Sequence, residues 1–320
     1  MNTSPMNTLQ MNTLARITAL LVLFNFPFGV LANAPKTLAF EEIVPGVHVH
    51  QGRIDDLFTA QFGPVANVTF IVGETSVALI DSGGSRRAGE MIYTAIRAVT
   101  PLPIRYVINT HVHPDHNFGN KAFLAEKPEF VAHFRYPGDF AAKTGDYLQR
   151  LNAPWFEGTT PVAATWLIDT STQFDLGNRR ITLTPHDRAH TRHDLSVFDE
   201  QTQTLIAGDL LFVEHIPTLD GNLIGWLNVM DELDQLPYQR VVPGHGAVQL
   251  RTTFSERSAF AHQRHYLESL TASVRDAIHQ HIDINTASNT LMKDHAKQWA
   301  LFDAFHPRNV IQAYKELEWE

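Results

Sequence analysis

The chain has 320 residues, 44% of them hydrophobic, which is enough for one large domain or a domain with an appendage. Its 25 basic and 34 acidic side chains give a formal net charge of −9, with no basic cluster interleaved with aromatic residues, and this argues against a nucleic-acid partner. The absence of cysteine excludes disulfide bonds and thiolate metal ligands.

Residues 1–32 have the pattern of a secretory signal peptide. Arg16 precedes an apolar run over residues 17–28, and small residues follow up to Ala32. The run is too short, and too interrupted by Pro27, to span a membrane. We therefore expect cleavage after Ala32, a periplasmic or secreted protein, and no stable membrane insertion once the signal is removed.

The first half of the chain is predicted to be rich in β-strands. Strands are expected between residues 43 and 80 and over 104–108, followed by a short helix near 121–126 and a strand over 130–133. The polar and aromatic segment 137–165 then intervenes. We interpret it as a lid or substrate wall, with a surface helix and connector as the alternative.

A histidine-rich motif directly follows the apolar run 104–108. The segment 110–119, THVHPDHNFG, places three histidines and one aspartate within six residues. His111 and His113 are two residues apart, so they project in the same direction, and neutral imidazoles suit zinc. After Pro114, which blocks regular strand pairing, Asp115 and His116 can turn toward a second ion.

Three later positions offer further ligands, each beside an apolar run. They are His190, Asp209 and His245. Two neighbouring ions need a shared anionic ligand, and Asp209 suits that role because it follows the buried-type strand 204–207. Gly208 lets the chain turn closely past the metals, and the glycines on either side of His245 indicate a backbone that approaches something closely. Taken alone, Asp209 would be read as a turn residue.

The second half repeats the strand pattern and ends in helices. Strands are predicted over 181–183, 195–198, 204–207 and 240–242. Apolar residues then recur at helical spacing from Ser255, a candidate N-cap, to about His281, and a last helix is expected over 307–320. We expect one domain over residues 40–250 and a helical extension, 251–320, packed on it.

The order and chemistry of the ligand residues resemble the metallo-β-lactamase superfamily, whose motifs run HxHxDH, then His, Asp and His. The resemblance covers roughly residues 40–249 and implies an α/β fold, a four-layer αββα sandwich with C-terminal helices. It implies two Zn²⁺ per chain: one bound by His111, His113 and His190, one by Asp115, His116 and His245, with Asp209 bridging both. It also implies that Asp81 supports the metal loop. His193 stands where members often have glycine, so it is either a substrate contact or a surface histidine.

Such a site predicts hydrolysis. Two ions held mainly by neutral imidazoles keep a high positive charge, so a water bridging them would be hydroxide near neutral pH. This hydroxide would attack the carbonyl carbon of a small-molecule ester, thioester or lactam, and Asp115 would be the catalytic residue that orients the nucleophile and shuttles its proton.

Within the superfamily, the aspartate at position 209 excludes the lactamases that place a cysteine there and resembles the hydroxyacylglutathione-hydrolase-like branch. The opening segment 44–52, together with the signal, is most similar to the quinoprotein relay system zinc metallohydrolases, which implies association with periplasmic quinoprotein oxidation systems and a redox partner. The alternatives are a β-lactamase, a persulfide dioxygenase with mononuclear iron, and a non-catalytic metal-loaded accessory to a redox partner.

Overall fold

The computed structural model describes residues 38–60, 64–151, 154–251 and 258–320. The expected signal peptide, 1–32, and the expected helix N-cap, Ser255, lie outside these residues. Among the residues described, no helix is long and apolar enough to cross a membrane. The stretch from Lys36 to Glu320 forms one compact unit.

The first half of the chain builds a seven-stranded sheet, the N-terminal sheet, with strand order β1-β2-β3-β4-β5-β6-β7. The first four strands pair antiparallel and the last four pair parallel. Strand β4 is buried at all four positions, as expected of an apolar run in the parallel part of a sheet. The strands are β1 (Glu41–Val44), β2 (Val47–His50), β3 (Val68–Val72), β4 (Val77–Ile80), β5 (Ile104–Ile108), β6 (Glu129–His133) and β7 (Trp166–Ile168).

The second half builds a six-stranded sheet, the C-terminal sheet, with order β13-β12-β11-β10-β9-β8. Its strands pair antiparallel except for β11 and β12, which run parallel, so the carboxyl ends of these two strands lie at the same edge. The strands are β8 (Thr172–Asp175), β9 (Arg180–His186), β10 (Asp194–Asp199), β11 (Thr204–Phe212), β12 (Arg240–His245) and β13 (Gln249–Leu250).

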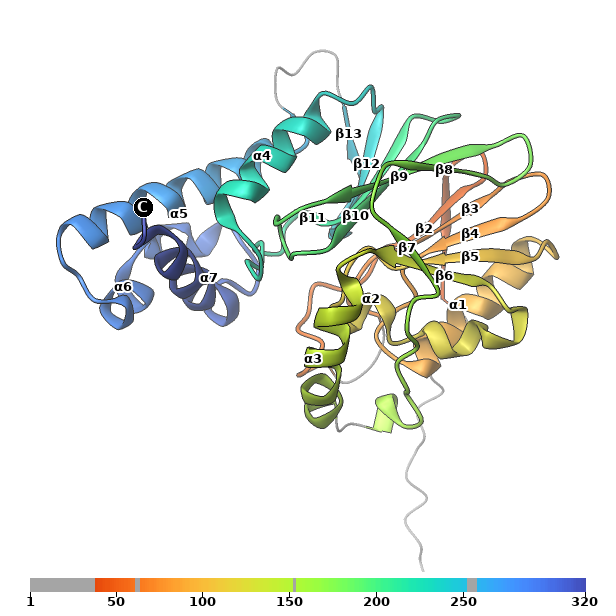
Figure 1. Ribbon diagram of the computed structural model, residues 1–320, viewed down its shortest axis with the longest axis horizontal. Coiled ribbons are helices and arrows are strands. Elements are labelled where there is room, and N and C mark those ends of the chain that lie inside the picture. Colours follow the sequence, from red (N-terminus) through yellow and green to blue (C-terminus); the bar gives the residue numbers. More distant parts are fainter. Residues whose placement is uncertain (1–37, 61–63, 152–153, 252–257) are drawn as a thin grey trace, which may run out of the picture. The chain divides into compact units, whose positions relative to one another are not determined.

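The two sheets pack face to face between helices, which confirms the predicted four-layer αββα sandwich. Their shared core is apolar and includes Val47, Ile71, Ile80, Ile108, Leu183, Val197, Ile206 and Val242. Helix α1 (Arg86–Val99) lies on the outer side of the N-terminal sheet, and α4 (Leu223–Asp234) and α5 (Ala261–His279) lie beside the C-terminal sheet (Figure 1). Helix α1 begins at Ser85, whose hydroxyl accepts from Ala88 N, and buries Ile92 and Ile96.

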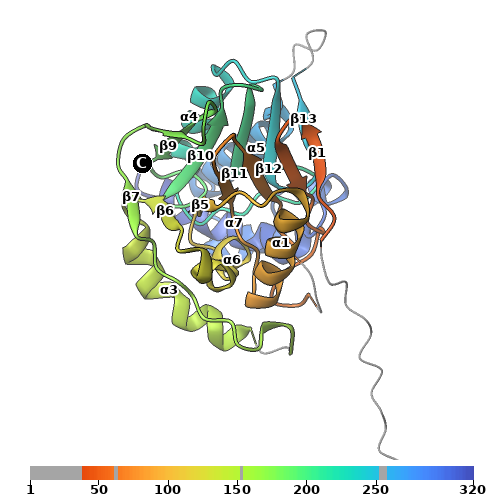
Figure 2. The same cartoon turned by 90° about the vertical axis from the view of Figure 1, so that its right-hand side faces the viewer.

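The C-terminal helices share a second core with β11. Buried side chains from α4, α5, α6 (Ile284–Thr290) and α7 (Phe302–Leu317) meet Leu210 and Phe212 there. Figure 2 shows α5 and α7 behind the strands of this half. The remaining helical segments are α2 (Pro114–Asn117), η1 (Asn120–Glu126), α3 (Tyr136–Arg150), η2 (Pro154–Phe156) and η3 (Lys293–Lys297).

Several expected boundaries were wrong: β9 and β12 each extend to a histidine three residues beyond the expected end, and two further boundaries are displaced by five residues. Strand β11 does not stop at residue 207 but continues, fully buried, to Phe212, because Gly208 takes a positive φ of 54° and absorbs a register shift against β12. Helix α7 begins at Phe302 rather than Pro307, since Phe302 and His306 bury against the second core. Pro307 removes the donor to the carbonyl of Asp303, a residue exposed to water, which limits the cost of a proline there.

The buried His306 predicts a loss of stability in mild acid. Its ring accepts from the Tyr266 hydroxyl and donates to Leu291 O, and burial lowers its pKa from 6.5 to about 4. The unfolded chain therefore binds a proton between about pH 6.5 and pH 4 that the folded chain does not, which lowers the free energy of unfolding as the pH falls, by at most about 1.4 kcal/mol per pH unit.

Urea unfolding at several pH values tests this with the variant His306→Gln. The stability advantage of the wild type over the variant is expected to shrink as the pH falls from 6.5 to 4, and to stay constant above pH 6.5. A difference that is the same at every pH would contradict the assignment of a buried neutral imidazole.

Candidate metal centre

All seven predicted ligand side chains meet at one edge of the sandwich. His111 and His113 follow β5, and Asp115 and His116 lie on the one-turn helix α2. His190 lies in the loop after β9, Asp209 within β11, and His245 at the end of β12. Their ligand atoms form two neighbouring groups: His111, His113, His190 and Asp209, and Asp115, His116 and His245.

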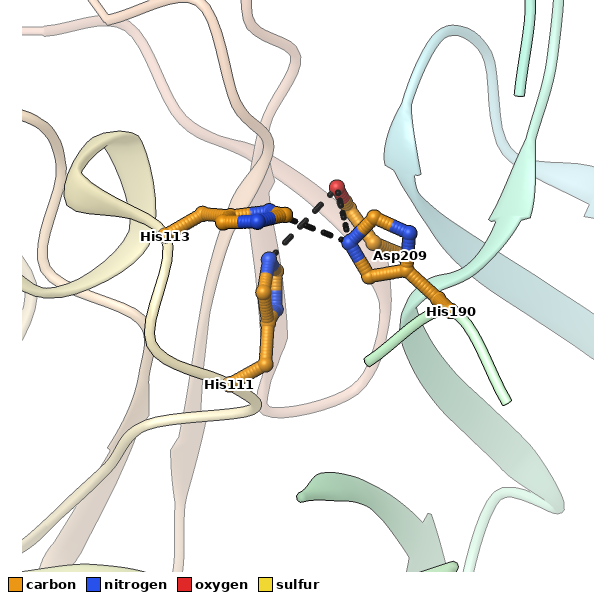
Figure 3. A group of neighbouring side chains, drawn as sticks. All are labelled: His111, His113, His190 and Asp209. Atoms are coloured by element: carbon orange, nitrogen blue, oxygen red, sulfur yellow. Dashed lines mark hydrogen bonds and ion pairs between the residues drawn. The ribbon is translucent and has the colours of Figure 1, made fainter. Parts of the chain in front are cut away.

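The first group joins the two halves of the molecule. Figure 3 shows His111 and His113 pointing from the loop after β5 toward His190 and Asp209 of the second half. His113 Nδ1 lies 3.1 Å from His190 Nε2, and Asp209 Oδ2 lies 3.4 Å from His190 Nε2 and 3.6 Å from His111 Nε2. Three imidazole nitrogens and one carboxylate oxygen thus converge, which is a donor set suited to zinc.

The other carboxylate oxygen of Asp209 serves the second group. Asp209 Oδ1 lies 3.2 Å from His116 Nε2 and 3.5 Å from His245 Nε2. Asp115 Oδ2 lies 3.4 Å from the same nitrogen of His245 and 3.6 Å from that of His116. Asp209 therefore turns one oxygen toward each group, as a carboxylate that bridges two ions does.

Each of the five histidines is held by a hydrogen bond at the ring nitrogen that points away from the centre. The pairs are His111 Nδ1 with Thr110 Oγ1 at 3.0 Å, His113 Nε2 with Asp220 Oδ2 at 3.1 Å, His116 Nδ1 with Asp81 Oδ2 at 2.7 Å, His190 Nδ1 with Thr218 O at 2.6 Å, and His245 Nδ1 with Val65 O at 3.1 Å. Such outer partners fix the orientation and tautomer of metal-binding histidines.

These partners determine which nitrogen carries the proton. Backbone carbonyls and carboxylates only accept, so the rings of four histidines must donate to them. The hydroxyl of Thr110 donates to Asp81, so it accepts from His111. In every neutral ring the inward nitrogen then carries no proton and presents a lone pair. His113 Nδ1 and His190 Nε2 face each other in this way, 3.1 Å apart.

Converging lone pairs require a positive charge between them. His111 Nε2, His116 Nε2 and Asp209 Oδ1 are buried atoms that have no hydrogen-bond partner among the residues described. Burial disfavours the charged imidazole, yet Asp209 and Asp115 outweigh it and raise the pKa of His245 to about 9. A field that holds a proton in this way also favours a divalent cation, so the donor set fits two metal ions.

Asp81 ties the metal loop to the end of β4, as expected. It accepts from Thr110 N at 2.9 Å and from His116 Nδ1, and burial raises its pKa despite these bonds. Its φ is 61°, in the left-handed region that a residue other than glycine rarely takes. The surrounding bonds thus maintain a strained backbone that aims one carboxylate at two elements of the site.

Glycine is required where β12 passes β11. A Cβ on Gly244 would lie 1.8 Å from Asp209 Oδ1 and 2.8 Å from Asp209 N. This is the close approach that the glycines flanking His245 predicted. The backbone of β12 therefore sets the position of the carboxylate shared by both groups.

Helix α7 supports the centre from outside it. Asn309 accepts from Leu219 N at 2.9 Å and donates to Pro217 O at 2.6 Å, and so fixes the segment on both sides of Thr218. The carbonyl of Thr218 is the partner of His190. The sequence carries no local signal for this link, because the residues lie about 90 positions apart.

Ion pairs connect helix α3 to the edge of the sandwich that carries the candidate ligands. Lys143 pairs with Asp220, the partner of His113, and His193 Nε2 contacts Asp139 Oδ2 at 3.2 Å. His193 is buried and does not line the cavity described below, so its expected role as a substrate contact was wrong, as was the surface alternative. The imidazole of His193 interacts with the carboxylate of Asp139 instead.

A cavity of about 390 Å³ opens over the centre. The residues of the centre that line it are His113, Asp115, Asp209 and His245. From the segment 137–165, expected to form a lid or wall, the helix α3 contributes Tyr147 and Arg150. Asp115 is the carboxylate of the second group that faces this space. Burial opposes its ionisation, but His116 and His245 outweigh burial and lower its pKa to about 2.

A family model described as the metallo-beta-lactamase superfamily matches residues 63–245, which include all seven side chains. The chain belongs to the metallo-beta-lactamase superfamily. No curated protein matches it significantly. Among solved structures, a metallo-beta-lactamase from Pontibacter korlensis has a TM-score of 0.57 and 18% identity over 72% of this chain and 99% of its own. One from Hirschia baltica has a TM-score of 0.53 and 19% identity, over 72% and 98%.

A third structure resembles more of the chain. The stereoselective inverting sec-alkylsulfatase Pisa1 from Pseudomonas sp. has a TM-score of 0.66 and 17% identity, over 88% of this chain and 50% of its own. The match covers 88% of the 320 residues, which is more than residues 1–250 alone could supply. It therefore includes part of the C-terminal helical extension. At these identities the likeness concerns the fold, and this chain spans half the length of that sulfatase.

The close approach at Gly244 predicts a metal-binding defect. Gly244→Ala is expected to displace Asp209 and weaken zinc binding at least about tenfold, as loss of a supporting contact commonly does. The matched control is Gly145→Ala in α3, where a Cβ meets nothing within 4 Å, and which should be more stable by about 0.5–1 kcal/mol. Metal titration and elemental analysis of both variants measure this, and two tightly bound zinc ions in Gly244→Ala would contradict it.

Proposed function

We propose that this chain is an exported hydrolase that binds two zinc ions and acts on a carbonyl-type small molecule, an ester, thioester or lactam. The observation that carries the proposal is the convergence of five imidazole nitrogens around the two oxygens of Asp209. His111, His113 and His190 would hold one ion, Asp115, His116 and His245 the other, and Asp209 both.

When bound, the two ions would supply a water with a lowered pKa and polarise the substrate's oxygen. The chain's own groups prepare the rest. Asp115 is ionised and faces the cavity, so its carboxylate can orient a water and accept its proton. Phe212, Leu219 and the other apolar side chains of the cavity exclude bulk water and thereby strengthen these electrostatic interactions.

Export and a periplasmic redox partner remain part of the proposal. Export is supported by the arrangement of Arg16 and the apolar run in residues 1–32, and the partner by the resemblance of the opening strands to the quinoprotein-associated family. Mass spectrometry of the protein from the periplasm of an expressing host should give a mature chain beginning at Asn33, and an intact leader in a cytosolic protein would contradict export.

Metal content and activity should be lost together. The wild type is expected to bind two zinc ions, whereas His113→Ala should lose the first ion and at least about 10³-fold in kcat/KM, because a catalytic metal lacks a ligand. His262→Ala is the matched control, since His262 is exposed on α5, stacks on Trp299 and belongs neither to the ligand groups nor to the lining of the cavity. Elemental analysis, circular dichroism and turnover before and after chelation measure the effect; turnover that persists in chelator would refute the proposal.

A panel of chromogenic substrates separates the candidate reactions. It contains an aryl ester, a thioester and a β-lactam, and also a sec-alkyl sulfate, because the structural likeness to the sulfatase extends over the C-terminal helices. We expect turnover of the carbonyl compounds by the zinc-loaded wild type and none by Asp115→Asn, which loses both a ligand of the second ion and the group that would orient the water. No turnover of any member would favour a non-catalytic accessory instead.

A further inference from the structure

Helix α7 forms one wall of the cavity over the metal centre. Phe305, Arg308 and Gln312 recur at helical spacing along one face of the helix, and all three line the cavity, as does Ile311. The opposite wall comes from residues 55–58 and from Tyr147 and Arg150 of α3. A substrate at the metals therefore contacts a helix about 60 residues beyond the last ligand in the chain.

The cavity offers a largely apolar surface to the body of a substrate. The side chains that provide it are Leu57, Phe58, Phe212, Leu219, Phe305 and Ile311. Phe212 stacks on the ligand His245, with ring centroids 5.2 Å apart, so the apolar surface begins directly at the centre. A cavity of this size and lining fits a small organic molecule with a hydrocarbon body.

The charged groups of the lining differ in whether they already have a partner. Asp55 pairs with Arg53, Asp56 accepts from Phe58 N, and Asp220 pairs with His113 and Lys143. Arg150 lies over the Phe58 ring and near Asp146. Arg308, in contrast, is exposed, lies 5.5 Å from the centroid of the Phe305 ring, and has no carboxylate partner among the residues described.

We propose that the substrate of this site is amphiphilic and anionic, and that Arg308 binds its charged group while the apolar lining holds its body. The inference rests on the proposed hydrolase function and adds the substrate class. A guanidinium matches the two oxygens of a carboxylate, sulfate or phosphate through paired hydrogen bonds. Because Arg308 lines the cavity but is not one of the ligand residues, it determines specificity through KM and leaves kcat unchanged.

Two nitrophenyl esters, one with a free carboxylate and one with that carboxylate methylated, test this on the zinc-loaded protein. Mono-4-nitrophenyl adipate carries a free carboxylate, and its methyl ester is neutral. The wild type should hydrolyse the anion with a kcat/KM about tenfold higher than that of the neutral ester, the effect of one charge-assisted contact. Arg308→Met should abolish this preference through KM, and Arg308→Lys should keep part of it.

Lys315→Met is the matched control. Lys315 is an exposed cation on the same helix that does not line the cavity, so its removal makes the same change in net charge. It should leave the preference intact. If Lys315→Met and Arg308→Met lower the preference equally, the effect is a general one of charge, and the assignment of Arg308 is overturned.

A binding measurement separates failure of this inference from failure of the hydrolase proposal. The fluorescent probes 8-anilino-1-naphthalenesulfonate and N-phenyl-1-naphthylamine share an apolar body and differ by one sulfonate. Arg308→Met should weaken binding of the sulfonate about tenfold and leave binding of the neutral probe unchanged. This result supports the pocket assignment even if neither ester is hydrolysed. Hydrolysis of both esters without a charge preference, or sulfonate binding unaffected by Arg308→Met, overturns the inference and leaves the hydrolase proposal standing.

Discussion

The structure depends on one buried carboxylate shared between two sets of imidazoles. Asp209 directs Oδ2 at His111 and His190 and Oδ1 at His116 and His245, so it holds together groups from both halves of the chain. Burying a carboxylate is unfavourable unless positive charge lies beside it, and protons or metal ions at the surrounding imidazoles supply that charge. The metal-binding character of the site thus follows from the electrostatics of its own side chains.

Much of the surrounding fold serves to hold that carboxylate and its five imidazoles in place. Gly244 lets β12 pass against Asp209, and the positive φ of Gly208 lets β11 continue beyond it. Asp81 has a strained backbone with a positive φ, and its carboxylate hydrogen-bonds both Thr110 and His116 and so positions them. Hydrogen bonds to carbonyls, carboxylates and a hydroxyl therefore fix the orientation of the five histidines, and close backbone contacts fix the position of Asp209.

The C-terminal helices connect this centre to its cavity. Through Asn309, α7 fixes the carbonyl that holds His190, and through Phe305 and Arg308 the same helix lines the cavity above the candidate ligands. A helix with both roles couples the geometry of the ligands to the shape of the pocket. The helical extension packs on the sandwich because its buried apolar side chains share a core with β11.

The sequence by itself indicated the candidate ligands, because apolar runs mark buried strands and the chemistry of histidine and aspartate at their ends is local. The fold class followed from the resemblance that these residues carry to the metallo-β-lactamase superfamily. The sequence also indicated the supporting role of Asp81 and the close approach at Gly244. Only the tertiary structure decided that β11 runs through Asp209, that His193 is buried against Asp139, and that Asp220, Asn309 and Arg308 belong to the site. These contacts join residues 54 to 107 positions apart or arise where helices meet over a cavity, and no periodicity or spacing along the chain records such distances.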